Sequence, residues 1–149
     1  MTATVGRRAP DFELLTTDGL TFRLSELRGK AVLLYFWATW CQPCKIQMPW
    51  LVEFQNAYGD EGFQVVAVAL DDASTEEVSA FARQMGVNYP ILIGNDSVAK
   101  RYNGVDVLPT TFYINRNRRL VAREFGLESR DVMAGHIKQA LGQLREAQK

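Results

Sequence analysis

Cysteine is scarce in this sequence: only Cys41 and Cys44 occur among 149 residues, three positions apart. Two cysteines cannot form the disulfide framework of a small secreted scaffold. They also cannot complete a four-ligand zinc site unless His136 and a carboxylate join them. A disulfide across so short a loop constrains the unfolded chain by only about 2 kcal/mol, against about 5 kcal/mol for a hundred-residue loop. We therefore expect the pair to serve chemistry and not stability.

An excess of charge and long apolar runs are also missing. The 17 basic residues balance 17 acidic ones, so nothing draws the whole chain to nucleic acid or to an anionic membrane. The longest apolar stretch, Ala31–Thr39, is far shorter than the roughly 20 residues of a membrane span. Met1–Pro10 carries two arginines with no apolar run after them, which predicts neither a signal peptide nor a membrane anchor in these residues.

The composition indicates one globular domain over residues 1–149. Apolar residues make up 47% of the chain and charged residues 23%, and no repeat, linker or low-complexity tract interrupts the pattern. A chain of this length buries roughly two-thirds of its surface on folding. We therefore expect a single core.

The hydrophobic pattern alternates between segments typical of strands and segments typical of helices, and it ends with a pair of strands and a final helix. This order predicts an α/β sandwich with a mixed sheet. The predicted strands are Phe12–Leu15, Leu20–Leu24, Ala31–Trp37, Phe63–Leu70, Pro90–Ile93, Thr110–Asn115 and Leu120–Phe125. The predicted helices are a turn at Ser25–Leu27, Cys41–Tyr58, a helix capped within Asp71–Ser74 and running to Met85, Ser97–Tyr102, and one that begins at Ser129 and buries Met133, Ile137, Leu141 and Leu144.

The cysteines fall where a buried strand ends and a helix begins. A free thiol is mostly protonated at neutral pH, but unpaired N–H groups and the positive dipole end of a helix N-terminus favour the thiolate. We therefore expect Cys41 to be the nucleophile and Cys44, one turn further on the apolar face, to be the resolving thiol. Pro43 should hold the first turn rigid, so that both sulfurs stay within bonding reach.

The segment Phe36–Lys45, which reads F-W-A-T-W-C-Q-P-C-K and is followed by Pro49, resembles the active site of the thioredoxin superfamily. The segments Ala9–Phe12, Leu24–Lys30 and Val107–Phe112 look like those of its bacterial TlpA/ResA-type subgroup, the redoxin or AhpC/TSA-type thiol-disulfide oxidoreductases. The resemblance implies a thioredoxin-like three-layer α/β/α sandwich with a central mixed sheet, an N-terminal β-hairpin extension and an inserted βα unit. It covers about residues 9–126.

The resemblance also assigns residues around the cysteines. It implies that Pro109 forms a cis peptide bond beside them, where a residue without an N–H leaves neighbouring backbone groups free to pair with an extended substrate. Leu108 would help to shape the reactive surface. Trp40 and Gln42 are expected to complete a modest apolar docking surface, and Trp37 is expected in the core.

Two departures concern the proton acceptor for the resolving thiol. Many relatives carry a glutamate three residues after the second cysteine, where this chain has Gln47, and thioredoxins carry a buried aspartate at the position of Tyr35. Asp71 and Asp72, after a neighbouring strand, are candidate replacements, although helix capping also explains an aspartate there. Arg118 stands where the family turn commonly has glycine.

Other features have simpler interpretations. His136 lies far from the cysteines in sequence and is expected at the surface or at its boundary. Arg116–Arg119 would suggest a nucleic-acid patch in isolation, but between two strands it reads as a solvated hairpin turn.

The function these observations favour is thiol-disulfide exchange by a protein-disulfide reductase, because no charged residue between the sulfurs would make the disulfide a strong oxidant. Two alternative functions fit the sequence less well. A thiol peroxidase would need proline at the position of Leu34 and threonine or serine at the position of Ala38. A copper chaperone typically uses C-x-x-x-C with a histidine, whereas this chain has C-x-x-C. We expect no cofactor or metal beyond the Cys41–Cys44 disulfide. The expected partners are protein thiols or disulfides and an upstream electron donor. We expect no nucleic-acid or membrane partner, and we expect the protein to be a monomer. The resemblance implies a periplasmic or other extracytoplasmic location, with the cytoplasm as the alternative.

Overall fold

The apolar run Ala31–Trp37 forms strand β3, and all seven of its residues are buried. The computed structural model describes residues 3–143. A strand that is apolar at every position must be covered on both faces. β4 (Phe63–Ala69) pairs with β3 in parallel, and β6 (Thr110–Ile114) pairs with its other edge in antiparallel orientation. The predicted central strand is therefore confirmed, with the same bounds.

The complete sheet is mixed and has seven strands in the order β2-β1-β5-β4-β3-β6-β7. The N-terminal hairpin joins the sheet through β1, which runs antiparallel to β5. β6 and β7 form a second hairpin at the opposite edge. This topology confirms the expected hairpin extension and mixed sheet. The remaining strands are β1 (Glu13–Thr16), β2 (Thr21–Arg23), β5 (Ile91–Ile93) and β7 (Leu120–Phe125).

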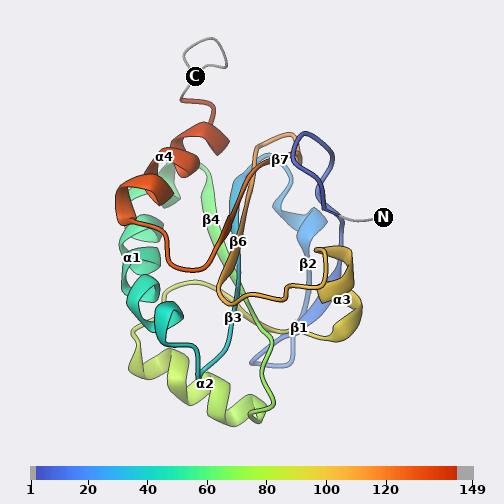
Figure 1. Cartoon of the computed structure of the whole chain (residues 1–149), viewed down its shortest axis with the longest axis vertical. Helices are drawn as coiled ribbons and strands as arrows, with labels where there is room; N and C mark the ends of the chain where they lie inside the picture. The colour runs from blue at the N-terminus through green and yellow to red at the C-terminus, as the bar shows by residue number, and fades with distance from the viewer. Residues whose placement is uncertain (1–2, 144–149) are drawn as a thin grey trace.

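Helices cover the two faces of the sheet unequally (Figure 1). The odd-numbered residues of β3 pack on one face against α1 (Gln42–Tyr58), α2 (Thr75–Gln84) and α4 (Arg130–Ala140). The even-numbered residues pack on the other face against the N-terminal segment, the 3-10 turn η1 (Leu24–Leu27) and the short α3 (Asp96–Arg101). A further turn, η2 (Gly59–Glu61), links α1 to β4. Between α2 and β6 the chain adds the strand β5 and the short helix α3.

The caps of α2 and α4 lie where the sequence predicted them. Ser74 is the N-cap of α2, and it forms a capping box with Glu77, so Asp71 is not the capping residue. Ser129 caps α4 as expected, and Met133 and Ile137 are buried on its inner face. The position predicted for Leu144 lies outside the described residues.

No helix within residues 3–143 is both long and apolar enough to cross a membrane.

Candidate active site

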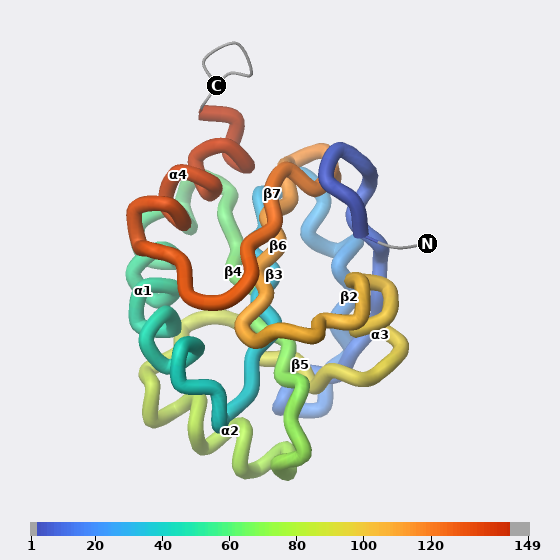
Figure 2. The backbone as a smooth tube through the Cα atoms, in the orientation of Figure 1, coloured from blue at the N-terminus to red at the C-terminus, as the bar shows by residue number. Residues whose placement is uncertain are grey.

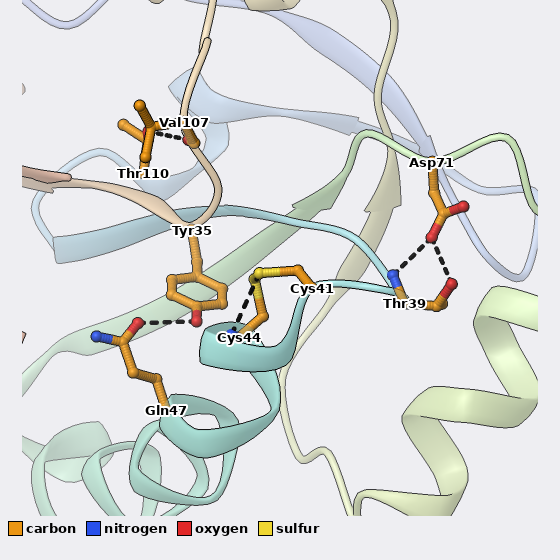
Figure 3. Close-up of a disulfide and its surroundings, with 8 residues drawn as sticks. All are labelled: Tyr35, Thr39, Cys41, Cys44, Gln47, Asp71, Val107 and Thr110. Atoms are coloured by element: carbon orange, nitrogen blue, oxygen red, sulfur yellow. Dashed lines mark hydrogen bonds between the residues drawn. A yellow bond between two sulfur atoms is a disulfide. The ribbon is translucent and has the colours of Figure 1, made fainter. Parts of the chain in front are cut away.

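Cys41 and Cys44 are joined in a disulfide, with 5.3 Å between their Cα atoms (Figure 3). Cys41 is the N-cap residue of α1, and its Sγ accepts the backbone N–H of Cys44 at 3.3 Å. Pro43 occupies the first turn, where its missing N–H leaves no bond unmade. Cys41 is 3% exposed, whereas Cys44 is fully buried. In the reduced protein, the helix N-terminus and this N–H donor would favour a thiolate on Cys41.

The strand register places the proline loop at the same edge of the sheet. Phe36 of β3 pairs with Thr110 of β6, so Pro109 lies opposite the end of β3 from which the chain continues to Cys41. The Leu108–Pro109 peptide bond is cis, as the resemblance implied. The Thr110 hydroxyl donates to the Val107 carbonyl and so braces this loop (Figure 3).

The surface around the disulfide is partly apolar. Trp40 is 67% exposed and Gln42 is exposed, whereas Trp37 is fully buried and stacks on Phe81. Two further exposed apolar side chains, Val107 and Phe125, lie on the segments that meet at this edge. They were missed from the sequence because nothing in the pattern of a loop or an edge strand shows which apolar residue stays uncovered.

Tyr35 and Gln47 form a buried polar pair next to Cys44. The Tyr35 hydroxyl donates to Gln47 Oε1 at 2.9 Å (Figure 3). Gln47 Nε2 in turn donates to the Glu128 carbonyl at 3.2 Å. Burial, with a smaller contribution from Tyr89, raises the pKa of Tyr35 far above its ordinary value. The positions where relatives carry an acid therefore hold two groups that do not ionise near neutral pH.

Asp71 follows β4 at the edge of the sheet that carries the disulfide. Its carboxylate, however, binds the segment before the cysteines, at Thr39. One oxygen accepts both the N–H and the hydroxyl of Thr39 at 2.6 Å, and the other accepts the N–H of Ala73. Partial burial raises the pKa of Asp71, but the hydrogen bonds from Thr39 and Ala73 outweigh it and lower the pKa below the ordinary value. Figure 3 shows this carboxylate directed at Thr39 and away from Cys44. The contacts favour a positioning role over that of a proton acceptor.

A second buried polar group, Glu124, was not singled out in the sequence. It is 4% exposed, accepts the Tyr113 hydroxyl at 2.8 Å and pairs with Nδ1 of the partly exposed His136. Burial and the neighbouring Glu124 raise the pKa of Tyr113. No group of three or more histidine, cysteine or acidic side chains within residues 3–143 lies where it could hold a metal ion.

A disulfide at a helix N-terminus, set beside a cis-proline at the edge of a mixed α/β sheet, defines the class of thioredoxin-like thiol-disulfide oxidoreductases. The chain belongs to the AhpC/TSA family, whose family model matches residues 5–123. It is 38% identical over 135 residues to the thiol-disulfide oxidoreductase ResA of Geobacillus kaustophilus, across 90% of this chain and 76% of that protein.

Two further comparisons agree. The ResA of Bacillus thuringiensis is 31% identical over 134 residues, across 90% of this chain and 77% of that protein. The fold matches the crystal structure of a thiol:disulfide interchange protein described as DsbE from Chlorobium tepidum, with a TM-score of 0.85 and 35% identity over 95% of this chain and 100% of that one. The protein is therefore an oxidoreductase that carries out thiol-disulfide exchange at Cys41 and Cys44.

Proposed function

We propose that the protein reduces disulfides in other proteins, with Cys41 as the nucleophile and Cys44 as the resolving thiol. The observation that carries the proposal is the asymmetry of the pair. Cys41 caps α1 and keeps a small exposed fraction of 3%, whereas Cys44 is fully buried on the inner face of the helix. Of the two sulfurs, the one on Cys41 is therefore the more accessible to a substrate.

The reaction proceeds in two exchanges. The Cys41 thiolate attacks one sulfur of a substrate disulfide, that S–S bond breaks, and the departing substrate sulfur takes a proton from solvent. The Cys44 thiol then loses its proton to solvent and attacks Cys41 Sγ, which releases the second substrate sulfur as a thiolate. Two electrons pass from the dithiol to the substrate, and the protein is left with the disulfide seen here. An upstream thiol donor must reduce it again.

The docking surface suits an extended protein segment. Pro109 offers no N–H, so the backbone groups beside the cis bond can pair with a substrate strand, as in β-augmentation. Leu108, next to this bond, is half-buried. Trp40 and Gln42, on either side of Cys41, and Val107 in the proline loop are exposed. Substrate recognition would then rest on main-chain pairing and modest apolar contact.

The direction of electron flow follows from the residues between the sulfurs. Gln42 and Pro43 carry no charge that would strongly stabilise the Cys41 thiolate, so the reduced form is not favoured as it is in strong oxidants. We expect a reduction potential nearer to thioredoxin, about −270 mV, than to the oxidases, when the protein is equilibrated with glutathione. A value more positive than about −180 mV would overturn the assignment as a reductant.

The nucleophile is tested by turnover. Cys41→Ser should abolish the reduction of insulin disulfides, with Thr17→Ser, a variant of a partly exposed hydroxyl in the β1–β2 turn, as a control that retains it. Activity retained in Cys41→Ser would refute the role of Cys41.

We further propose that residues 1–149 form one thioredoxin-like domain that acts as a monomer outside the cytoplasm. The two core clusters, one on each face of the sheet, support a single domain. The resemblance to the TlpA/ResA-type subgroup supports the location. Light scattering in solution should give the mass of one chain, 16.8 kDa, and a dimer mass would contradict it. Fractionation of cells that express the native gene should place the protein outside the cytoplasm, and a purely cytosolic signal would contradict that location.

A further inference from the structure

Five arginines gather at the end of the sheet opposite to the disulfide. Together with Asn117 they line a groove of about 550 Å³ beside the turn between β6 and β7. Figure 2 shows the N-terminal segment next to this turn, at the far end of the sheet from the start of α1. β3 begins near this end and its seven residues span about 23 Å, so the groove is remote from Cys41. The five are Arg8, Arg28, Arg116, Arg118 and Arg119.

The positive charge of the groove has no local partner. No carboxylate lines the groove, and within residues 3–143 none of the five arginines forms an ion pair. The chain as a whole has a formal net charge of zero, so this concentration is local. Like charges held together around a concave surface raise the local potential and attract an anion.

The backbone holds these side chains in place. Arg8 and Arg119 face each other in an isolated β-bridge, and the N–H of Ala9 donates to the Arg118 carbonyl at 2.8 Å. Arg116 donates to the carbonyls of Leu141, Gly29 and Glu61, which fixes its guanidinium at the edge of the groove. The segments that carry the arginines are thus held together without a ligand, and Arg116 is fixed by its own side chain as well.

Arg118 provides an independent observation. Its φ of +65° is in the left-handed region, which glycine adopts without the cost of about 1 kcal/mol that a side chain brings. Its Nε is buried and has no hydrogen-bond partner. The strained backbone and the unsatisfied donor together mean that the described residues do not supply the partner that this guanidinium requires.

We propose that this groove binds a phosphate group, through the guanidinium groups of Arg8, Arg28, Arg118 and Arg119. The planar guanidinium donates two parallel N–H bonds to a tetrahedral oxyanion, and several such donors surround one phosphate in a concave site. The phosphate comes either from a small soluble molecule or from the headgroup of an anionic lipid. In the second case the protein would face the membrane with this end and present the disulfide to solvent.

Two binding experiments distinguish these sources. In the first, pyrophosphate is titrated into the full chain in about 100 mM KCl, and the arginine Nε–H resonances are followed by NMR. In the second, the protein is sedimented with vesicles that contain phosphatidylglycerol, with pure phosphatidylcholine vesicles for comparison. Saturable shifts at Arg118 without sedimentation assign a soluble ligand, and sedimentation with phosphatidylglycerol alone assigns a lipid headgroup. Absence of both overturns the proposal.

Variants localise the binding. Arg28→Gln/Arg118→Gly removes two guanidinium groups and places glycine where the backbone favours it. We expect affinity for phosphatidylglycerol vesicles to fall roughly thirtyfold, and affinity for pyrophosphate at least about tenfold. Arg8→Gln/Arg28→Gln should also weaken binding. This variant leaves the turn between β6 and β7 unchanged.

Arg83→Gln/Lys100→Gln is the matched control, because it removes two exposed positive charges elsewhere and should leave binding unchanged. Insulin reduction should be normal in all of these variants, since none touches the disulfide. Equal binding by wild type and both groove variants would overturn the proposal, as would an equal loss in the control.

Discussion

The residues next to Cys44 decide how its proton is handled. Tyr35 and Gln47 hydrogen-bond to each other beside Cys44. Neither ionises near neutral pH, because Gln47 is an amide and burial raises the pKa of Tyr35. Neither position therefore offers Cys44 a carboxylate that could take its proton. This pair satisfies two buried polar groups and supports the first turns of α1.

Gln47→Glu tests this account of Cys44. A carboxylate three residues along the helix would disfavour the nearby thiolate, so the pKa of the Cys44 thiol in the reduced protein should rise. The pH profile of insulin reduction should gain a second titration that the wild type lacks. Thiol alkylation against pH measures the change, and Gln84→Glu on the exposed side of α2 is the control. An unchanged Cys44 titration in Gln47→Glu would contradict this account.

Asp71→Asn separates positioning from proton transfer. If Asp71 anchors the loop through Thr39, the variant should leave the Cys44 titration unchanged and lower the free energy of unfolding at pH 7 by about 1 kcal/mol. Because the folded-state pKa of Asp71 is lowered, its stabilisation is present above pH 4 and is lost as the pH falls through the folded-state value.

Urea unfolding at pH 7 and near pH 2 measures the difference between wild type and Asp71→Asn, which should be largest at pH 7 and vanish in acid. A shifted Cys44 titration in this variant would instead make Asp71 the proton acceptor.

At the level of elements, the sequence predicts what depends on local pattern. β3 and β7 have the predicted bounds. The apolar run of β3 defines a strand directly, whereas in β7 only the burial alternates and the buried Glu124 breaks the apolar pattern. The sequence does not single out the N-cap of α2, since it offers several capping residues in a row. Only the folded backbone shows that Ser74 is the one used. Glu124 could not be recognised as buried, because its partners Tyr113 and His136 come from two other elements.

His136→Ala tests how α4 is held on the sheet. Removal of the imidazole leaves the buried Glu124 carboxylate with the Tyr113 hydroxyl as its remaining side-chain partner, which should cost about 1–3 kcal/mol of unfolding free energy. Glu124→Gln on the same background should recover part of the loss, because a buried amide needs no counter-charge. Chemical denaturation of the four proteins in the cycle gives the coupling energy. A coupling near zero would show that the pair does not hold α4.

The whole molecule has two functional ends. The carboxyl ends of β3 and β4 carry the disulfide, Asp71 and the neighbouring cis-proline loop, whereas the turn between β6 and β7 and the N-terminal segment carry the arginine groove. The motif around Cys41 made the first end predictable. The groove was not, because Arg8 and Arg28 come from segments that only the folded chain brings to Arg116–Arg119.

The central claim, that exchange begins at Cys41 and is completed by Cys44, is tested most directly by trapping the mixed disulfide. Reduced Cys44→Ser should form a stable covalent adduct with a disulfide-bonded substrate protein, and peptide mass spectrometry should locate the bond at Cys41. Reduced wild type should release the same substrate as free thiols. An adduct that forms on Cys44 in Cys41→Ser, with none on Cys41 in Cys44→Ser, would contradict the account.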